Sequence, residues 1–218
     1  MTSQLVSPRF LFRFSLPLRH REPLWTAQPT ELDESFALPN LLELDGRKPY
    51  AELRGAWNAT GLMFSVRVDG KRQPPWCRET RPDESDSLRI WIDTRNTQNI
   101  HRASRFCHNF FILPAGAGRT LDDPVVEQML INRAKEHAKP IRPGSLQARC
   151  QKRVGGYTLE TFIPAAALTG FDPVEHPKLG FTYAVIDREL GEQTLNCPAE
   201  FPYREDPSLW ATLELVRS

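Results

Sequence analysis

The sequence lacks a long apolar run, a surplus of charge of either sign and any block of basic residues. Its 28 Lys and Arg residues balance 27 Asp and Glu residues, which leaves a net charge of +1 over 218 residues. A nearly neutral chain exerts no long-range attraction on nucleic acid or on an anionic membrane. No apolar segment has the length of a membrane-spanning helix. We therefore expect neither nucleic acid nor a membrane as a partner.

The first residues also lack the features of an export signal. Their apolar part is interrupted by Arg13 and Pro17, and no small-residue cleavage site follows. The alternation over residues 9–16 indicates a strand instead. The sequence therefore predicts a cytoplasmic protein, in which thiols stay reduced. Its four cysteines are expected to be free, with two disulfides as the alternative that an even number leaves open.

Proline is abundant, at 19 residues, and it interrupts both helix interiors and central strands. Short segments joined by turns are the natural result, and they favour β structure. We predict one all-β domain over residues 1–218, a mainly antiparallel β-sandwich with short helical turns in its loops. A first strand and an irregular wrap occupy residues 1–49, and residues 50–217 form the core of the sandwich. Further strands are expected over 50–57, 62–68, 88–93, 105–113, 147–154, 157–163, 179–187 and 209–216.

Residues 122–138 fit two structures. Asp123 as an N-cap and Pro124 at the first helical position favour a helix. A strand through residues 127–133 is the alternative, and the sequence leaves both open.

The segment from residue 85 to residue 108 concentrates residues that could carry chemistry. Alternation over 88–93 places Leu88, Ile90 and Ile92 on one face of a strand, and Arg89, Trp91 and Asp93 on the other. Downstream, His101, Cys107 and His108, together with Cys77, are candidate zinc ligands or a Cys/His nucleophile pair. The spacing matches no common zinc motif, and the adjacent Cys107 and His108 must face opposite ways on a strand. A metal-dependent or Cys/His enzyme is therefore the least favoured interpretation.

Acidic residues around the same strand suggest a hard cation. Asp83, Asp86 and Asp93 could supply oxygen ligands to calcium, although no helical calcium-loop pattern is present. The alternative is an ordinary solvated acidic loop.

Two aromatic residues lie next to prolines in predicted loops. Trp76 follows Pro74 and Pro75, and Tyr203 follows Pro202. Their rings could stack on a ligand, or they could cap the ends of the sandwich core.

Several motifs occur in a recognisable order. They are Trp57 with Gly61-Leu62, Trp76 before the segment 86–93, residues 156–164, Leu179-Gly180-Phe181, and residues 203–208 before the last strand. Together they resemble the family 9 carbohydrate-binding module and its DOMON-like relatives, over residues 50–217. The resemblance implies a non-catalytic β-sandwich, with structural calcium in some members.

In sugar-binding members of that family, two aromatic residues clamp a terminal sugar, and the matching positions here are Trp76 and Tyr203. Family members also place polar side chains on the facing strands, at positions that correspond to Arg89, Phe111, Leu113 and Ala184. The predicted saccharide contacts are accordingly Trp76, Tyr203, Arg89, Asn109, Glu200 and Arg204. Because three of the four strand positions are apolar, a structural or protein-interaction sandwich without a small ligand is the alternative.

Overall fold

The computed structural model describes residues 12–29, 31–41, 46 and 48–217, and these residues confirm the all-β prediction. Regular structure consists of strands and short 3-10 turns. The strands are β1 (Ser15–His20), β2 (Ala51–Asn58), β3 (Gly61–Asp69), β4 (Ser87–Asp93), β5 (Cys107–Ala117), β6 (Asp123–Met129), β7 (Gln147–Arg153), β8 (Gly156–Pro164), β9 (Lys178–Asp187), β10 (Gly191–Thr194) and β11 (Ala211–Val216). The turns are η2 (Glu34–Phe36), η4 (Pro82–Glu84), η5 (Ala165–Ala167) and η6 (Pro207–Leu209).

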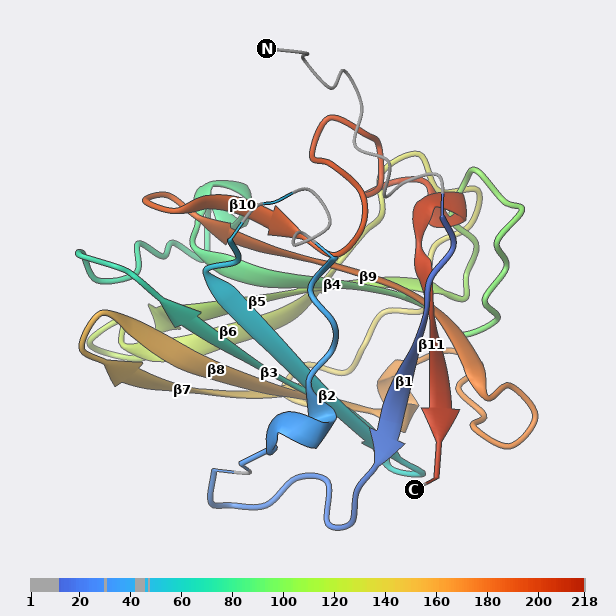
Figure 1. Ribbon diagram of the computed structural model, residues 1–218, viewed down its shortest axis with the longest axis horizontal. Helices are drawn as coiled ribbons and strands as arrows, with labels where there is room; N and C mark the ends of the chain where they lie inside the picture. The colour runs from blue at the N-terminus through green and yellow to red at the C-terminus, as the bar shows by residue number, and fades with distance from the viewer. Residues whose placement is uncertain (1–11, 30, 42–45, 47, 218) are drawn as a thin grey trace.

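All of these strands belong to one continuous sheet that folds over a shared core (Figure 1). Its order is β6-β5-β4-β9-β11-β1-β2-β3-β8-β7, and β10 pairs with β9 outside this path. One layer contains β2, β3, β8 and β7, and the opposite layer contains β6, β5, β4 and β9. Side chains from both layers meet in one hydrophobic core. The sandwich is therefore one sheet closed by β11 and β1, and not two separate sheets.

Strand β1 differs from its prediction in place and direction. It begins at Ser15, whereas the alternation predicts a strand over 9–16, of which residues 9–11 lie outside the described residues. It runs parallel to both neighbours, β11 and β2, although most of the sheet is antiparallel as predicted. Pro17 is tolerated because β1 pairs with β2 only at Arg19 and His20, so a missing N–H at Pro17 interrupts no ladder on that side.

Two tight hairpins connect strands whose ranges the sequence predicted. Asn58 pairs with Gly61 at the end of the β2–β3 hairpin, and Arg153 pairs with Gly156 at the end of the β7–β8 hairpin. At Gly61 a side chain would meet the backbone oxygen of Ile163 at 2.2 Å, so only glycine lets β8 approach β3 this closely.

The ambiguous segment 122–138 contains a strand and no helix. In β6, Asp123 and the residues from Val125 to Met129 pair with β5, and the chain turns after Met129. The register shifts between the Leu113 and Ala117 pairs, and Pro124 lies at this irregularity. At a bulge, residue 124 does not have to donate a backbone hydrogen bond to the neighbouring strand, so the sheet tolerates Pro124. The proline therefore lies in a strand and does not begin a helix. The short strand β10 had no counterpart in the sequence-based expectations.

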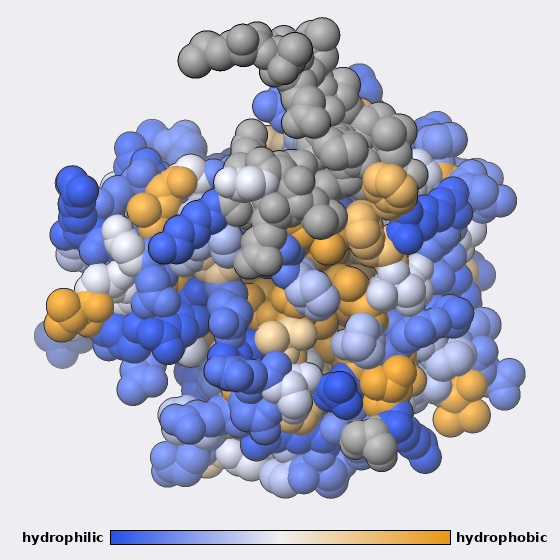
Figure 2. All heavy atoms as spheres, in the orientation of Figure 1, coloured by the Kyte–Doolittle hydropathy of each residue, from blue (hydrophilic) through white to orange (hydrophobic). Residues whose placement is uncertain are grey.

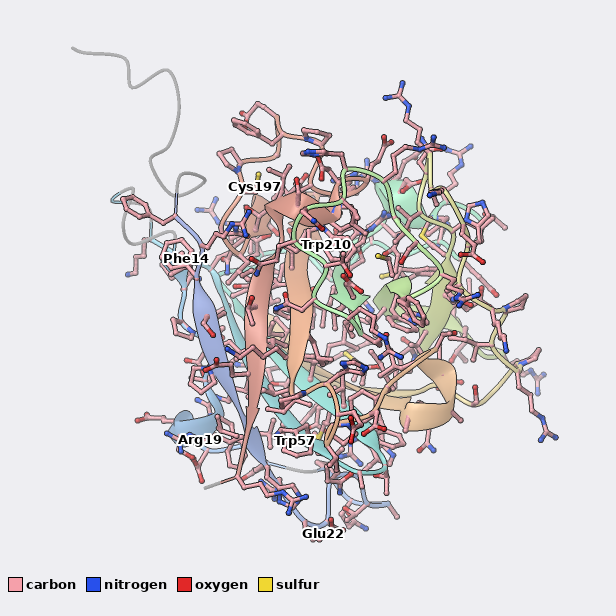
Figure 3. All side chains as sticks on the ribbon, turned by 90° about the vertical axis from the view of Figure 1, so that its right-hand side faces the viewer. Phe14, Arg19, Glu22, Trp57, Cys197 and Trp210 are labelled. Carbon is pink, nitrogen blue, oxygen red and sulfur yellow. The ribbon has the colours of Figure 1, made fainter. Side chains whose placement is uncertain are left out.

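Alternation along β4 is confirmed. Leu88, Ile90 and Ile92 point into the main core, while Trp91 points outward. A second hydrophobic cluster covers Trp91 on that outer face, and it includes Tyr203, Cys197 and Trp210. Cys197 and Trp210 lie toward the same end of the molecule (Figure 3). The loop between β4 and β5 and the loops that follow β6 and β10 thus build a second layer of packing outside the sheet.

Hydrophilic residues cover most of the face shown in Figure 2, and hydrophobic residues gather toward its centre. Among the described residues, no helix has the length and apolar character needed to traverse a bilayer.

Candidate functional site: a pocket over strands β4 and β5

A pocket of about 570 Å³ opens over the outer face of β4 and β5. Arg89 and Trp91 of β4 and Asn109 of β5 line it from the sheet, and Trp91 and Asn109 are direct cross-strand partners. The segment from Met129 to Ala134, with His137, forms one wall, and Arg204 and Glu205 form another. The volume is in the range of small-molecule sites in proteins.

Polar atoms of the three sheet residues have no hydrogen-bond partner among the described residues. These atoms are Arg89 Nε, Trp91 Nε1 and Asn109 Oδ1. The residues are only 2%, 0% and 6% exposed. Most buried polar atoms in proteins are paired, because an unpaired one loses its hydration without compensation. Three such residues around one pocket make it the candidate site.

The rest of the Arg89 guanidinium is engaged by the neighbouring turn η4. Its Nη2 donates to the Pro82 backbone oxygen at 2.8 Å, and its Nη1 lies 2.8 Å from Asp83 Oδ1. The Arg89 side chain is buried at 3% exposure, whereas the Asp83 side chain is 69% exposed. The carboxylate therefore reaches in from the rim of the pocket toward a buried cation.

Ion pairs fix the opposite wall. Arg204 Nη2 donates to Glu192 Oε2 at 2.9 Å, and Arg204 Nε donates to the Tyr203 hydroxyl at 3.2 Å. Glu205 accepts a hydrogen bond from Asn132 Nδ2 at 2.9 Å, which joins the two walls of the pocket. The wall is thus held by contacts that are independent of any ligand.

Only part of the predicted saccharide contacts come together here. Arg89, Asn109 and Arg204 line the same pocket, whereas Trp76, Tyr203 and Glu200 do not. Glu200 is exposed in the loop before Tyr203. Trp91, which the sequence places on the same strand face as Arg89, lines the pocket and is missing from the predicted set.

The predicted aromatic clamp is not formed. Tyr203 is fully buried, its ring stands edge-on to Trp91 at 5.4 Å, and its hydroxyl donates to Glu192. Burial raises the pKa of Tyr203, and the Glu192 hydrogen bond adds to this shift. Trp76 is half-buried, with the guanidinium of Arg188 at 4.3 Å from its ring and that of Arg78 at 5.5 Å. Tyr203 thus caps the outer cluster, which is the alternative role that the sequence left open.

The three predicted calcium ligands are held apart. Asp86 and Asp93 flank the two ends of β4, roughly 23 Å apart at the rise of an extended strand. Asp93 accepts hydrogen bonds from the backbone of Arg95 and Thr97, at 2.9 and 2.6 Å, and burial raises its pKa. Asp83 is paired with Arg89. No group of three His, Cys, Asp or Glu residues suited to a metal occurs within the described ranges, so the structure does not assemble the expected calcium site.

Asp86 belongs to a buried ion cluster. Lys71 Nζ lies 3.0 Å from Asp86 Oδ2 and 2.5 Å from Asp187 Oδ2, and all three side chains are nearly inaccessible. Asp86 also accepts hydrogen bonds from the backbone of Trp76 and Arg188. The cluster therefore ties the loop that carries Trp76 to the ends of β3 and β9.

The Cys/His alternative is not supported by the geometry. Cys107 faces the outer cluster, while the His108 ring stacks on Phe110, which belongs to the main core. Burial raises the pKa of Cys107 to about 12 and lowers the pKa of His108 to about 4. A thiol in this state is a poor nucleophile. His101 is exposed and contacts Asp206 at 3.1 Å, away from both. None of the four cysteines, which all lie in the described ranges, forms a disulfide, as predicted.

A larger hollow of about 720 Å³ lies on the opposite layer, over β2, β3, β8 and β7. Several of its charged side chains pair within the chain. Arg149 pairs with Glu160, and Arg54 contacts both Glu52 and the Leu32 backbone oxygen. Among the described residues, none that lines this hollow has a buried side-chain polar atom without a hydrogen-bond partner, unlike the pocket over β4 and β5.

No protein-family model matches the chain, and no curated protein matches it. Solved structures do match. A family 9 carbohydrate-binding module from Caldicellulosiruptor kristjanssonii in complex with cellotriose is 13% identical, with a TM-score of 0.60 over 94% of this chain and 95% of that one. The module from the same organism in complex with glucose is 12% identical, with a TM-score of 0.62 over 94% and 97%.

A proposed carbohydrate-binding protein from Bacteroides uniformis is 15% identical, with a TM-score of 0.56 over 94% of this chain and 100% of that one. At such identities the likeness establishes the fold. It confirms the resemblance that the ordered motifs indicate, while the likeness to DOMON-like relatives stays a prediction. The chain has the fold of the family 9 carbohydrate-binding modules.

Proposed function

We propose that this protein is a non-catalytic module that binds a saccharide in the pocket over β4 and β5. The observation that carries the proposal is the set of partnerless buried polar atoms on Arg89, Trp91 and Asn109, which all line this pocket. The fold supports it, because similar structures have been solved with cellotriose and with glucose.

The lining suits a sugar. Saccharide hydroxyls both donate and accept, so they match in type the unpaired donors Arg89 Nε and Trp91 Nε1 and the unpaired acceptor Asn109 Oδ1. Met129, Leu130 and Ile131 add apolar surface on the wall, against which the C–H groups of a sugar ring can pack. Specificity arises in this way when buried polar groups would otherwise remain unpaired.

No catalytic role is part of the proposal. Cys107 and His108 lie on opposite sides of β5, and neither lines the pocket. The carboxylates Asp83 and Glu205 at the pocket are paired with Arg89 and with Asn132. Binding without turnover is the expected behaviour.

The test is a glycan array with the purified protein, followed by calorimetry on the glycans that bind. Asn109→Leu should abolish binding, since it removes the carboxamide from the pocket. Gln151→Leu, which changes a polar side chain in the hollow on the opposite layer, should bind as the parent protein does. Equal binding by Asn109→Leu and the parent, or a loss with Gln151→Leu alone, would refute the assignment of the site. A blank array would favour the protein-interaction alternative.

A further inference from the structure

The pocket over β4 and β5 has more cations than anions. Arg89, Arg133 and Arg204 line it, with His137 at the wall, against the carboxylates of Asp83 and Glu205. Arg204 has Glu192 as a partner at 2.9 Å, and Arg133 has Glu205 at 3.9 Å. Both of these carboxylates also hold neighbouring side chains, so they stay in place when a ligand enters.

Arg89 is different, because its carboxylate partner comes from the rim. The Asp83 side chain is 69% exposed and lies on the three-residue turn η4, whereas the Arg89 side chain is 3% exposed. The exposed Asp83 carboxylate stays in contact with water, so it can leave Arg89 without itself becoming a buried, unpaired charge. A buried guanidinium left without an anion is unfavourable, and another carboxylate would restore the pairing.

The position of Asp83 also shows which chemical group fits beside Arg89. A carboxylate oxygen lies 2.8 Å from Arg89 Nη1, and Arg89 Nε has no partner among the described residues. A ligand carboxylate that enters from the pocket could take the place of Asp83 at Nη1, where it would accept a charge-assisted hydrogen bond.

From this geometry we infer that the ligand is an acidic saccharide, a sugar with a carboxylate such as a uronic acid, and that its carboxylate replaces Asp83 on Arg89. The inference rests on the proposed function and specifies its ligand class. Asp83 acts as an internal competitor that occupies Arg89 while the pocket is free of ligand. Neutral sugars, which leave Asp83 in place, bind more weakly.

The experiment is titration calorimetry at low salt with matched pairs: glucose and glucuronate, galactose and galacturonate, and mannose and mannuronate, each as monomer and trimer. At least one uronate should bind about tenfold more tightly than its neutral partner, since hydrogen bonds to charged groups are the stronger class. Asp83→Asn should tighten uronate binding several-fold, by a clearly larger factor than any change in the binding of the neutral partner. Arg89→Gln should remove the preference for the acidic partner.

Asp69→Asn is the matched control, because Asp69 is also an exposed aspartate paired with an arginine, Arg67 at 2.9 Å, and it lies outside this pocket. It should change nothing. If Arg89→Gln fails to fold, Asp83→Asn alone decides, since it changes only an exposed side chain.

Each other outcome overturns the inference in a distinct way. Equal or tighter binding of neutral sugars refutes the acidic ligand and leaves the proposed function standing. Tighter binding of glucose 6-phosphate than of glucuronate refutes the carboxylate. Competition by acetate at the same concentration as the uronate shows an anion site without saccharide recognition. No binding by any sugar refutes the proposed function as well.

Discussion

Replacing Asn109 by leucine should make the protein more stable while it abolishes ligand binding. Asn109 is 6% exposed, and its Oδ1 has no partner among the described residues. An unsatisfied buried polar group costs about 1–3 kcal/mol. Part of the carboxamide lies at a pocket wall that water can reach, so we take the lower end and expect a gain of about 1 kcal/mol. Leucine has a similar size, which limits the strain from repacking.

Asn58→Leu provides the contrast, with the same substitution at similar burial. Asn58 is 2% exposed, and its Oδ1 accepts from the backbone N–H of Thr60 at 2.8 Å, while its Nδ2 donates to Glu22 Oε2 at 2.8 Å. This variant should lose about 2–4 kcal/mol, because the substitution removes the hydrogen bond to the Thr60 backbone and the stronger hydrogen bond to the charged Glu22 carboxylate.

Urea denaturation at 25 °C, followed by tryptophan fluorescence, measures both variants against the parent protein. The free energy of unfolding should rise for Asn109→Leu and fall for Asn58→Leu. A loss of more than 1 kcal/mol for Asn109→Leu would show that the carboxamide is paired within the chain. In that case the pocket would lack the unpaired carboxamide oxygen of Asn109, and the proposed binding site would be refuted.

Three further predictions concern groups outside the pocket. Burial lowers the folded-state pKa of His108 to about 4, so the unfolded state binds more protons than the folded state between pH 6.5 and 4. The free energy of unfolding should therefore fall by up to about 3 kcal/mol as the pH drops through this window. His108→Phe should reduce this pH dependence, measured by urea denaturation at pH 7 and pH 4.5. Lys71→Met should lower the free energy of unfolding by about 3–5 kcal/mol, because it leaves the carboxylates of Asp86 and Asp187 buried without a cation; a loss under 1 kcal/mol would contradict the ion cluster. Burial raises the pKa of Cys107 to about 12 and that of Cys150 to about 11. In the native protein no thiol should therefore react with a disulfide reagent within minutes at pH 8, while all four should react in denaturant. Fast modification of native Cys107 would instead support its role as a nucleophile.

Local sequence patterns were sufficient to predict strands whose structure depends on their own residues. Alternation in β4 predicted which of its side chains face the core, and the strands expected over 147–154 and 157–163 formed with nearly those bounds. In β6 the local signals of Asp123 and Pro124 also fitted a helix, and pairing with a distant segment, β5, decided for a strand. β10 is four residues long, too short for alternation to be visible in the sequence.

The site was harder because it depends on contacts between distant segments. The prolines near Tyr203 suggested a loop in which its ring could stack on a ligand. The ring instead packs against Trp91 and its hydroxyl binds Glu192, and both partners belong to other elements of the chain. The cross-strand pairing of Trp91 with Asn109 requires a register that no local pattern gives. Arg89 and Asn109 could be predicted from alternation, whereas the wall from Met129 to Ala134 could not, since its structure was ambiguous in the sequence.

The pairing of β1 with β11 has a consequence for how the protein folds. Nearly the whole chain separates Ser15 from its partner Thr212, and β1 meets β2 at only two positions. Contacts between such distant segments impose a large entropic cost of loop closure and slow folding. During synthesis, the first strand of the sheet leaves the ribosome long before its main partner exists. The hairpins β2–β3 and β7–β8 can form as soon as they emerge, and insertion of β1 beside β11 is then expected to complete the sheet as the last step.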